Sequence, residues 1–375
     1  MFYHINIPDI HIVPYGDPYT FYQDELSNVL EFILDNPVSL VTIAGDLFDT
    51  IYKGDSLEIQ IGLRFIHQLV KLCKAKDASL RMINGTNTHD YDQLKMFEKY
   101  EYDPDSDVKI IMEPYTEEFK DDIKVMYLPE EYSKNYNEFK EEHLDEVVDI
   151  IVFHGMVRGA MSIAEDPNDS EIILETEDIQ NISNLYAVGG HIHTRTFIEN
   201  NIWYTGSFSS KSYSDANEKK GFDYITLYDD NEVNIEFIEN TDCYKFVTKD
   251  MTETFMTSSR DVLRARLVDM KRDYDYKTNV RIDVDTSNLT EVQMENLEFI
   301  KVKFRSIFDF KTFKEELDSD EETVKKKIEE ANYVLDSEVS LVDKTLAEMK
   351  EKKEILGIKD KDIDKNKVTQ LFKEE

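Results

Sequence analysis

Short apolar runs that each end in aspartate, histidine or glycine constrain this chain more than any other feature. Five of them lie within the first 193 residues, and their polar ends read DIH (9–11), GDLFD (45–49), GTNTHD (85–90), HG (154–155) and GHIH (190–193). Apolar runs of this length are typical of buried strands. In α/β sheets, functional side chains gather at the carboxyl ends of strands, because loops converge there. The pattern therefore predicts that these five ends meet in one pocket.

The segments between the runs predict the fold class. Residues 19–35 and 57–75 carry apolar side chains at helical spacing, whereas short strand-like segments dominate from residue 108 to residue 239. Helices between the early strands and a surplus of later strands predict an α/β sandwich, with two sheets inside and helices outside.

The charge distribution divides the chain into three predicted domains. The net charge is −35, of which residues 1–244 carry −30, residues 245–310 carry 0 and residues 311–375 carry −5. Shifts of this size mark boundaries near residues 244 and 310.

The middle and last segments differ in pattern. Residues 245–310 predict a small unit in which strand and helix alternate, with FIKVKF (299–304) as its last strand. Residues 311–375 are rich in charge and predict two helices. Each of these helices has a narrow apolar stripe, at 324–335 and at 342–349, that we expect to dock on a partner.

Composition excludes two classes of protein. The chain has no run of about 18 apolar residues, so no membrane span is expected. A strongly acidic chain is poorly suited to bind nucleic acid on its own.

The two cysteines, Cys73 and Cys243, make no disulfide framework and indicate a reducing cytoplasm.

Histidine and carboxylate side chains together indicate a metal site. Imidazole nitrogens and carboxylate oxygens suit manganese, iron or zinc. A single histidine at a strand end is more often a cap or a core residue, and each motif alone is weak evidence. The ordered set of five within one span favours a shared metal pocket over that structural reading. His4, His67 and His143 lack such a setting and are expected to be structural.

The ordered series of motifs resembles that of the calcineurin-like metallophosphoesterase superfamily. The GDLFD motif, the chain length, the small second segment and the helical tail are similar to the SbcD-type DNA exonuclease subunit, the counterpart of the eukaryotic meiotic-recombination nuclease. Phage-encoded versions carry a third motif of the form Gly-Thr-x-x-His-Asp, as at residues 85–90. The resemblance implies a metallophosphoesterase sandwich, then a small capping domain and a helical tail. It also implies a homodimer in the cytoplasm, that of the host for a phage protein.

The resemblance further implies a dinuclear metal site that hydrolyses phosphodiester bonds of DNA. Two divalent ions, above all Mn²⁺, are expected. Asp9, His11 and His193 would bind the first ion, and His154 and His191 would bind the second.

Four more residues receive roles from the same motifs. Asp46 would bridge the two ions. His89 would act near the leaving 3′ oxygen as proton donor or stabiliser, and Asp90 would orient His89 and favour its protonated form. Asp49 is either a carboxylate that supports a metal ligand or a cap on the next turn.

The third motif departs from the family pattern. The family has an asparagine immediately before the histidine, where it binds the second metal, but this chain has Thr88 there and Asn87 one residue earlier. Adjacent residues in an extended segment point in opposite directions, so Asn87 replaces the ligand only if a bulge redirects it. The alternatives are a weak ligand from the Thr88 hydroxyl, a water in the ligand position, or an Asn87 that only shapes a turn. Asn87 is the predicted ligand, and a weaker second metal site is expected.

The expected partners are DNA and an ATPase. Arg260, Arg264 and Lys271 are the predicted DNA contacts in the capping segment, and the tail would bind an SbcC-type coiled-coil ATPase. Two alternatives remain open. One is a phosphatase or small phosphodiesterase of the same superfamily, and the other is a catalytically weakened scaffold for the ATPase.

Overall fold

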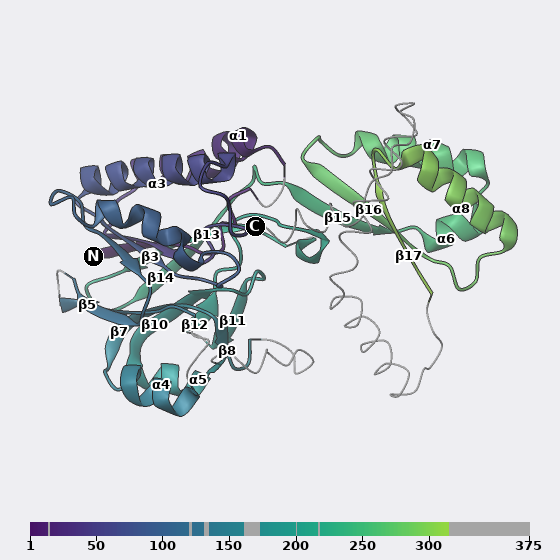
Figure 1. Cartoon of the computed structure of the whole chain (residues 1–375). Coiled ribbons are helices and arrows are strands. Elements are labelled where there is room, and N and C mark those ends of the chain that lie inside the picture. Colours follow the sequence, from purple (N-terminus) through teal and green to yellow (C-terminus); the bar gives the residue numbers. More distant parts are fainter. Residues whose placement is uncertain are drawn as a thin grey trace, which may run out of the picture. The chain divides into compact units, whose positions relative to one another are not determined.

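The computed structural model describes residues 1–13, 16–119, 122–130, 135–160, 173–199, 201–216 and 218–314. In this part of the chain, two six-stranded sheets are flanked by helices, as expected for an α/β sandwich (Figure 1). The tail stripes predicted at 324–335 and 342–349 lie outside the described residues. None of the described helices is both long enough and apolar enough to cross a membrane.

The first sheet has the strand order β14-β13-β1-β2-β3-β4. Strands β1 to β4 run parallel, while β13 pairs antiparallel with β1 and β14 pairs antiparallel with β13. The bounds are Phe2–Ile7 (β1), Leu40–Ala44 (β2), Ser79–Ile83 (β3), Val108–Ile111 (β4), Gly221–Leu227 (β13) and Val233–Glu239 (β14). All residues of β2 and β3 are buried, as the continuous apolar runs predict.

The second sheet has the strand order β11-β12-β10-β7-β6-β5. Its four central strands are parallel, and β5 and β11 are antiparallel edges. The bounds are Tyr115–Glu118 (β5), Lys124–Leu128 (β6), Val148–His154 (β7), Ser183–Gly190 (β10), Thr196–Glu199 (β11) and Ile202–Tyr204 (β12). A separate pair of short strands joins Met156–Val157 (β8) to Ile173–Leu174 (β9).

The two sheets pack face to face. One buried cluster joins Leu40 and Ile83 of the first sheet to Tyr127, Ile150 and Trp203 of the second. Helices cover the outer faces, with α3 over the first sheet and α4 and α5 over the second (Figure 1). The helical bounds are Pro18–Phe21 (α1), Tyr22–Leu26 (η1, a π-helical turn), Ser27–Asp35 (α2), Leu57–Lys76 (α3), Tyr91–Tyr100 (η2, a 3-10 helix), Tyr136–His143 (α4), Thr176–Ile182 (α5) and Tyr213–Asp215 (η4).

Helix α3 follows its sequence signals closely. Ser56 caps it, since its side chain accepts a hydrogen bond from the Ile59 amide. Asp77 ends it in the left-handed conformation. The predicted span of 57–75 is therefore confirmed. The predicted helix at 19–35 is present as the consecutive segments α1, η1 and α2.

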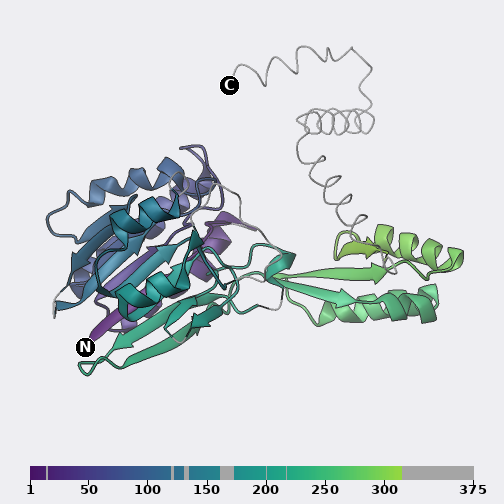
Figure 2. The ribbon, with the colours of Figure 1, turned by 90° about the horizontal axis from the view of Figure 1, so that it is seen from below.

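The segment after the sandwich has its own three-stranded sheet, in the order β15-β16-β17. It is coloured green in Figure 2. The bounds are Lys245–Asp250 (β15), Thr252–Thr257 (α6), Arg260–Arg272 (α7), Thr278–Asp285 (β16), Glu291–Phe304 (α8) and Asp309–Phe313 (β17). Among the described residues, Met1–Val284 and Asn288–Thr312 form one compact unit. The boundary predicted near residue 244 stays a prediction.

The expectation that residues 299–304 form a strand is wrong. These residues complete α8, in which Leu297, Ile300 and Phe304 are buried at helical spacing while Phe299 and Val302 are exposed. The alternation of apolar and polar residues in FIKVKF suggested a strand. The preceding Thr290 capping box starts a helix that continues through the run.

Candidate metal centre

Parallel pairing brings the carboxyl ends of both sheets to one place. In the first sheet, Ile7 pairs with Ile43, and Ala44 pairs with Ile83. In the second sheet, Gly190 pairs with His154. The two sets meet directly, because a Cβ at Gly190 would lie 2.3 Å from the Ala44 carbonyl oxygen. Only glycine allows this close approach of the two strand ends.

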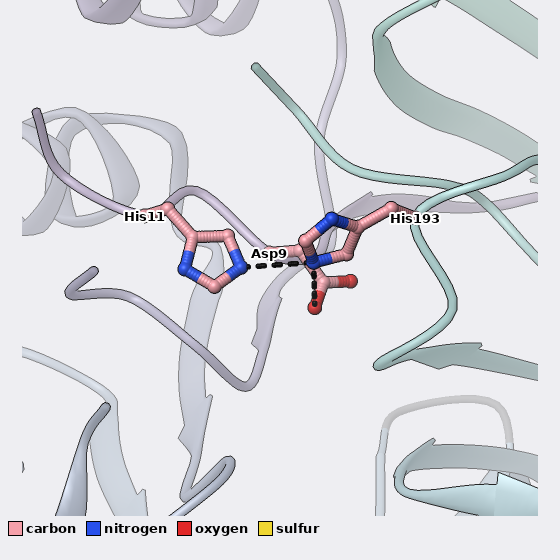
Figure 3. Close-up of side chains that lie close together, drawn as sticks. All are labelled: Asp9, His11 and His193. Atoms are coloured by element: carbon pink, nitrogen blue, oxygen red, sulfur yellow. Dashed lines mark hydrogen bonds and ion pairs between the residues drawn. The ribbon is translucent and has the colours of Figure 1, made fainter. Parts of the chain in front are cut away.

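Asp9, His11 and His193 form the first group of possible ligands (Figure 3). The Nε2 atoms of the two histidines are 3.0 Å apart, and Asp9 Oδ1 lies 3.9 Å from His193 Nε2. Both oxygens of Asp9 also accept hydrogen bonds of 3.0 Å from the His191 amide. The structure therefore brings together the three residues predicted for the first ion.

His154, His191 and Glu130 form a second group. Glu130 Oε2 lies 3.7 Å from His154 Nε2 and 3.6 Å from His191 Nδ1. His154 Nδ1–H donates to the Ala44 carbonyl at 2.8 Å, so the lone pair of the neutral ring is on Nε2. That Nε2 atom is buried and makes no hydrogen bond with the described residues. A buried imidazole nitrogen held in this tautomer fits a metal ligand.

Asp46 lies between the two groups. Its Oδ1 is 3.5 Å from His154 Nε2, and its Oδ2 is 3.8 Å from His11 Nε2. Burial favours the neutral carboxyl, but the positive charges that His154, His11 and His89 carry when protonated together outweigh this and lower the pKa of Asp46. An ionised carboxylate in this position has one oxygen toward each group, as a bridging ligand requires.

Four of these residues have an uncommon backbone conformation, among them His191 with a φ of 98°. Asp9, His11 and Asp46 have φ of 48°, 47° and 50°, in the left-handed region that side chains with a Cβ rarely occupy. Such residues cluster at functional sites, where the surrounding structure holds them. Hydrogen bonds from the Asp9 amide to Gly45 O and from the His11 amide to Asp46 O hold these two loops together.

His89 lies beside the bridging carboxylate. Its Nε2 is 3.9 Å from Asp46 Oδ2, and its Nδ1–H donates to the Asp49 carbonyl. Asp90 does not orient His89 in the way expected from the sequence. Its carboxylate accepts hydrogen bonds of 3.1 Å from the amides of Phe48 and Gly85. Asp90 therefore joins the second loop (residues 45–49) to the third loop (residues 85–90). Burial raises the pKa of Asp90 to about 7.

Asn87 and Thr88 are exposed, in a turn where the amides of His89 and Asp90 both donate to the Thr86 carbonyl. Thr86 faces the cluster instead. Its amide donates to Asp46 Oδ1 at 2.6 Å, and its hydroxyl donates to Glu130 Oε2 at 3.0 Å. The structure does not bring Asn87 and Thr88 together with the other predicted ligands.

Asp49 and Asp215 each lie beside a histidine of the first group. Asp49 Oδ1 is 3.5 Å from His11 Nδ1, which favours the reading as a supporting carboxylate over that as a turn cap. Asp215 Oδ1 is 3.6 Å from His193 Nδ1 and 2.9 Å from the buried Lys220 ammonium. The sequence reasoning missed Asp215, because no strand-end motif surrounds it.

Glu130 was also missed, although a signal for it existed. It follows Leu128, the last residue of β6, by two positions, so it too lies just beyond a strand end. The five motifs contain histidine, or aspartate next to glycine, at a strand end. A glutamate that follows a proline matches none of them, so the motifs did not predict Glu130.

The centre is open on one side. The side chains of His89, His191 and His193 are 20%, 22% and 27% exposed, whereas those of Asp9 and His154 are fully buried. Among the described groups of possible metal ligands, these three histidines are therefore the side chains that solvent reaches.

The predicted DNA contacts lie on α7, and all three side chains are exposed. Arg260 donates to Asn296 at 2.8 Å and packs over the Phe299 ring, and Arg264 lies 3.9 Å from Asp261. These contacts are those of a surface helix, and a role of Arg260, Arg264 and Lys271 in DNA binding stays a prediction.

Comparisons with known proteins give little guidance to function. No protein-family model and no curated sequence matches the chain. Among solved structures, 31 chains match. One of them, described only as a crystal structure, is 12% identical, with 63% of this chain and 98% of that chain covered and a TM-score of 0.39. A likeness at this level carries no argument about function.

Proposed function

We propose that this chain is a two-metal phosphodiesterase of the calcineurin-like metallophosphoesterase fold that hydrolyses DNA. It would be the nuclease subunit of a DNA repair and recombination complex with an SbcC-type ATPase. One observation carries the proposal. The Asp46 carboxylate lies between the His11 and His154 groups, with one oxygen toward each. The motif order along the chain supports the same reading.

The donor set fits two divalent cations such as Mn²⁺, because it consists of imidazole nitrogens and carboxylate oxygens. Two such cations would stabilise the negative charge that develops on a phosphate and lower the pKa of the attacking water. Asp9, His11 and His193 would hold one cation, and His154 and His191 the other. Asp46 would contact both.

His89 would supply the proton for the leaving oxygen. Its Nδ1–H donates to the Asp49 carbonyl, which fixes the ring orientation. The second proton of a charged ring is then on Nε2, the atom near Asp46 on the open side of the centre. A proton transferred from Nε2 would neutralise the departing 3′ oxygen as the P–O bond breaks.

DNA affinity would come largely from outside the sandwich. Residues 1–244 carry a net charge of −30, which repels a phosphate backbone, whereas residues 245–310 are neutral overall. The α7 cations and the partner ATPase would therefore supply most of the contacts to DNA.

The test is hydrolysis of a linear DNA duplex with Mn²⁺, for the wild type and for His89→Asn. Removal of a general acid is expected to lower the rate by about 10²- to 10⁴-fold, while the Mn²⁺ stoichiometry stays unchanged. His67→Asn is the matched control, because His67 is an exposed histidine on α3. Bis-nitrophenyl phosphate serves as a small substrate in parallel.

Two outcomes would contradict the proposal. Hydrolysis of the nitrophenyl ester without cleavage of DNA, alone or with the ATPase, would indicate a small-substrate enzyme. Mn²⁺ binding without hydrolysis of either substrate would indicate a scaffold.

A further inference from the structure

Glu130 is a buried carboxylate inside the metal centre to which no motif assigns a role. Its side chain is 2% exposed and belongs to the group formed with His154 and His191. The backbone places it there. Strand β6 runs parallel to β7, and Leu128 pairs with Phe153, so the residues after Leu128 lie beside His154 and Gly155. A Cβ at Gly155 would lie 3.6 Å from Glu130 Cγ.

Asn87, the amide ligand predicted for the second ion, does not lie at this place. Asn87 is exposed, and Thr86, the residue directly after Gly85, faces Asp46. The Thr86 hydroxyl is neutral and short, and here it donates to Glu130 Oε2 at 3.0 Å. Glu130 therefore holds its carboxylate where the His154 group needs another oxygen ligand.

We propose that Glu130 binds the second metal ion in place of the third-motif asparagine. This inference rests on the proposed function, because it assumes that His154 and His191 hold a cation. The second ion would then have two carboxylates, Asp46 and Glu130, and two imidazoles around it. An anionic oxygen in place of a neutral amide strengthens binding of a hard divalent cation. The altered third motif would then not weaken the second site.

Thr86 would position Glu130. Its hydroxyl hydrogen bond to Oε2 and its amide hydrogen bond to Asp46 Oδ1 hold the two carboxylates on the same side of the third loop. Thr86 would thus act through Glu130 and would not bind the metal itself.

The experiment measures Mn²⁺ binding directly. Metal-free protein is titrated by calorimetry, and bound Mn²⁺ is counted by electron paramagnetic resonance of the free ion. The wild type is expected to bind two Mn²⁺. Glu130→Gln keeps the shape of the side chain and an acceptor for Thr86. It is expected to raise the Kd for one of the two Mn²⁺ ions by at least about tenfold. Glu130→Ala is expected to bind only one ion under the same conditions.

Glu117→Gln is the matched control, because Glu117 is a largely buried glutamate outside the centre, where glutamine keeps an acceptor oxygen for Arg81. It is expected to bind two Mn²⁺ with wild-type affinity. Wild-type affinity for both ions in Glu130→Gln would overturn the inference and leave the proposed function standing. Failure of the wild type to bind two Mn²⁺ would overturn both.

Discussion

The stability of the loops around the metal centre should depend on one buried glutamate. Glu25 in η1 accepts hydrogen bonds from Ser209 Oγ at 2.5 Å and from Asn240 Nδ2 at 3.3 Å. One residue before Ser209, the Phe208 amide donates to the carbonyl oxygens of Pro8 and Asp9. The Glu25 network thus supports the segment behind the first metal ligand. Burial raises the pKa of Glu25 from 4.5 to about 7.

The sign of the pH effect follows from this pKa. Below about pH 4.5, both the folded and the unfolded chain hold the proton, and burial of the carboxyl carries no penalty from ionisation. Between 4.5 and about 7, the folded chain holds a proton that the unfolded chain has released, so the free energy of unfolding falls as pH rises. The gap between the two pKa values corresponds to a loss of about 3 kcal/mol in the free energy of unfolding, and this loss is complete above about pH 7.

Glu25→Gln should remove this dependence, since glutamine keeps the acceptor oxygen and cannot ionise. We expect the variant and the wild type to have similar stability at pH 5, and the variant to be more stable by up to about 3 kcal/mol at pH 8. Urea unfolding of metal-free protein at pH 5, 6, 7 and 8 measures the difference. Glu31→Gln, an exposed residue on α2, controls for the loss of one charge. A Glu25→Gln difference that stays constant from pH 5 to 8 would refute the reasoning.

Three other perturbations test different parts of the structure. Gly45→Ala places a Cβ 2.1 Å from His154 Nδ1 at a φ of +81°, so we expect loss of Mn²⁺ binding and destabilisation by at least about 1–2 kcal/mol, measured by calorimetry and urea unfolding. Mn²⁺ at 100 times its Kd should stabilise the folded chain by about 2.7 kcal/mol per site, and EDTA should reverse the rise in Tm. Truncation after residue 314 keeps β17 and should abolish co-purification with the ATPase, while metal-dependent hydrolysis of bis-nitrophenyl phosphate persists.

The positions of most predicted ligands followed from the sequence because parallel strands in register end together. Asp9, Asp46, His154 and His191 each come within two residues after a strand or at its last residue, and the structure groups them. His193 lies two residues beyond His191, three residues after the end of β10. Predicting this part of the centre requires only the order of the strands and the positions at which the apolar runs end.

The third motif could not be read in the same way, because its residues form a turn. Counting back from His89 gives Thr88 and then Asn87, and in an extended chain Asn87 would reach the metal only if a bulge redirected it. The hydrogen bonds from the amides of His89 and Asp90 to the Thr86 carbonyl close a turn instead, and this turn exposes both residues. Counting forward from Gly85, which fixes the start of the loop, selects Thr86. The side-chain period of a strand does not extend beyond its last residue.

The fold itself fixes the orientation of several histidines in the centre. His154 donates to the carbonyl of Ala44, the last residue of β2, and His89 donates to the carbonyl of Asp49. These two backbone carbonyls therefore determine which nitrogen of each ring is left without a donated hydrogen bond. Asp90 joins the second loop to the third through the amides of Phe48 and Gly85. Residues 44–49 therefore position three groups at once: the proposed bridging carboxylate, a proposed ligand of the second ion and the proposed proton donor. The proposed second site does not depend on an amide from the third motif, because Glu130, just beyond a strand end of the other sheet, places a carboxylate 3.7 Å from His154 Nε2.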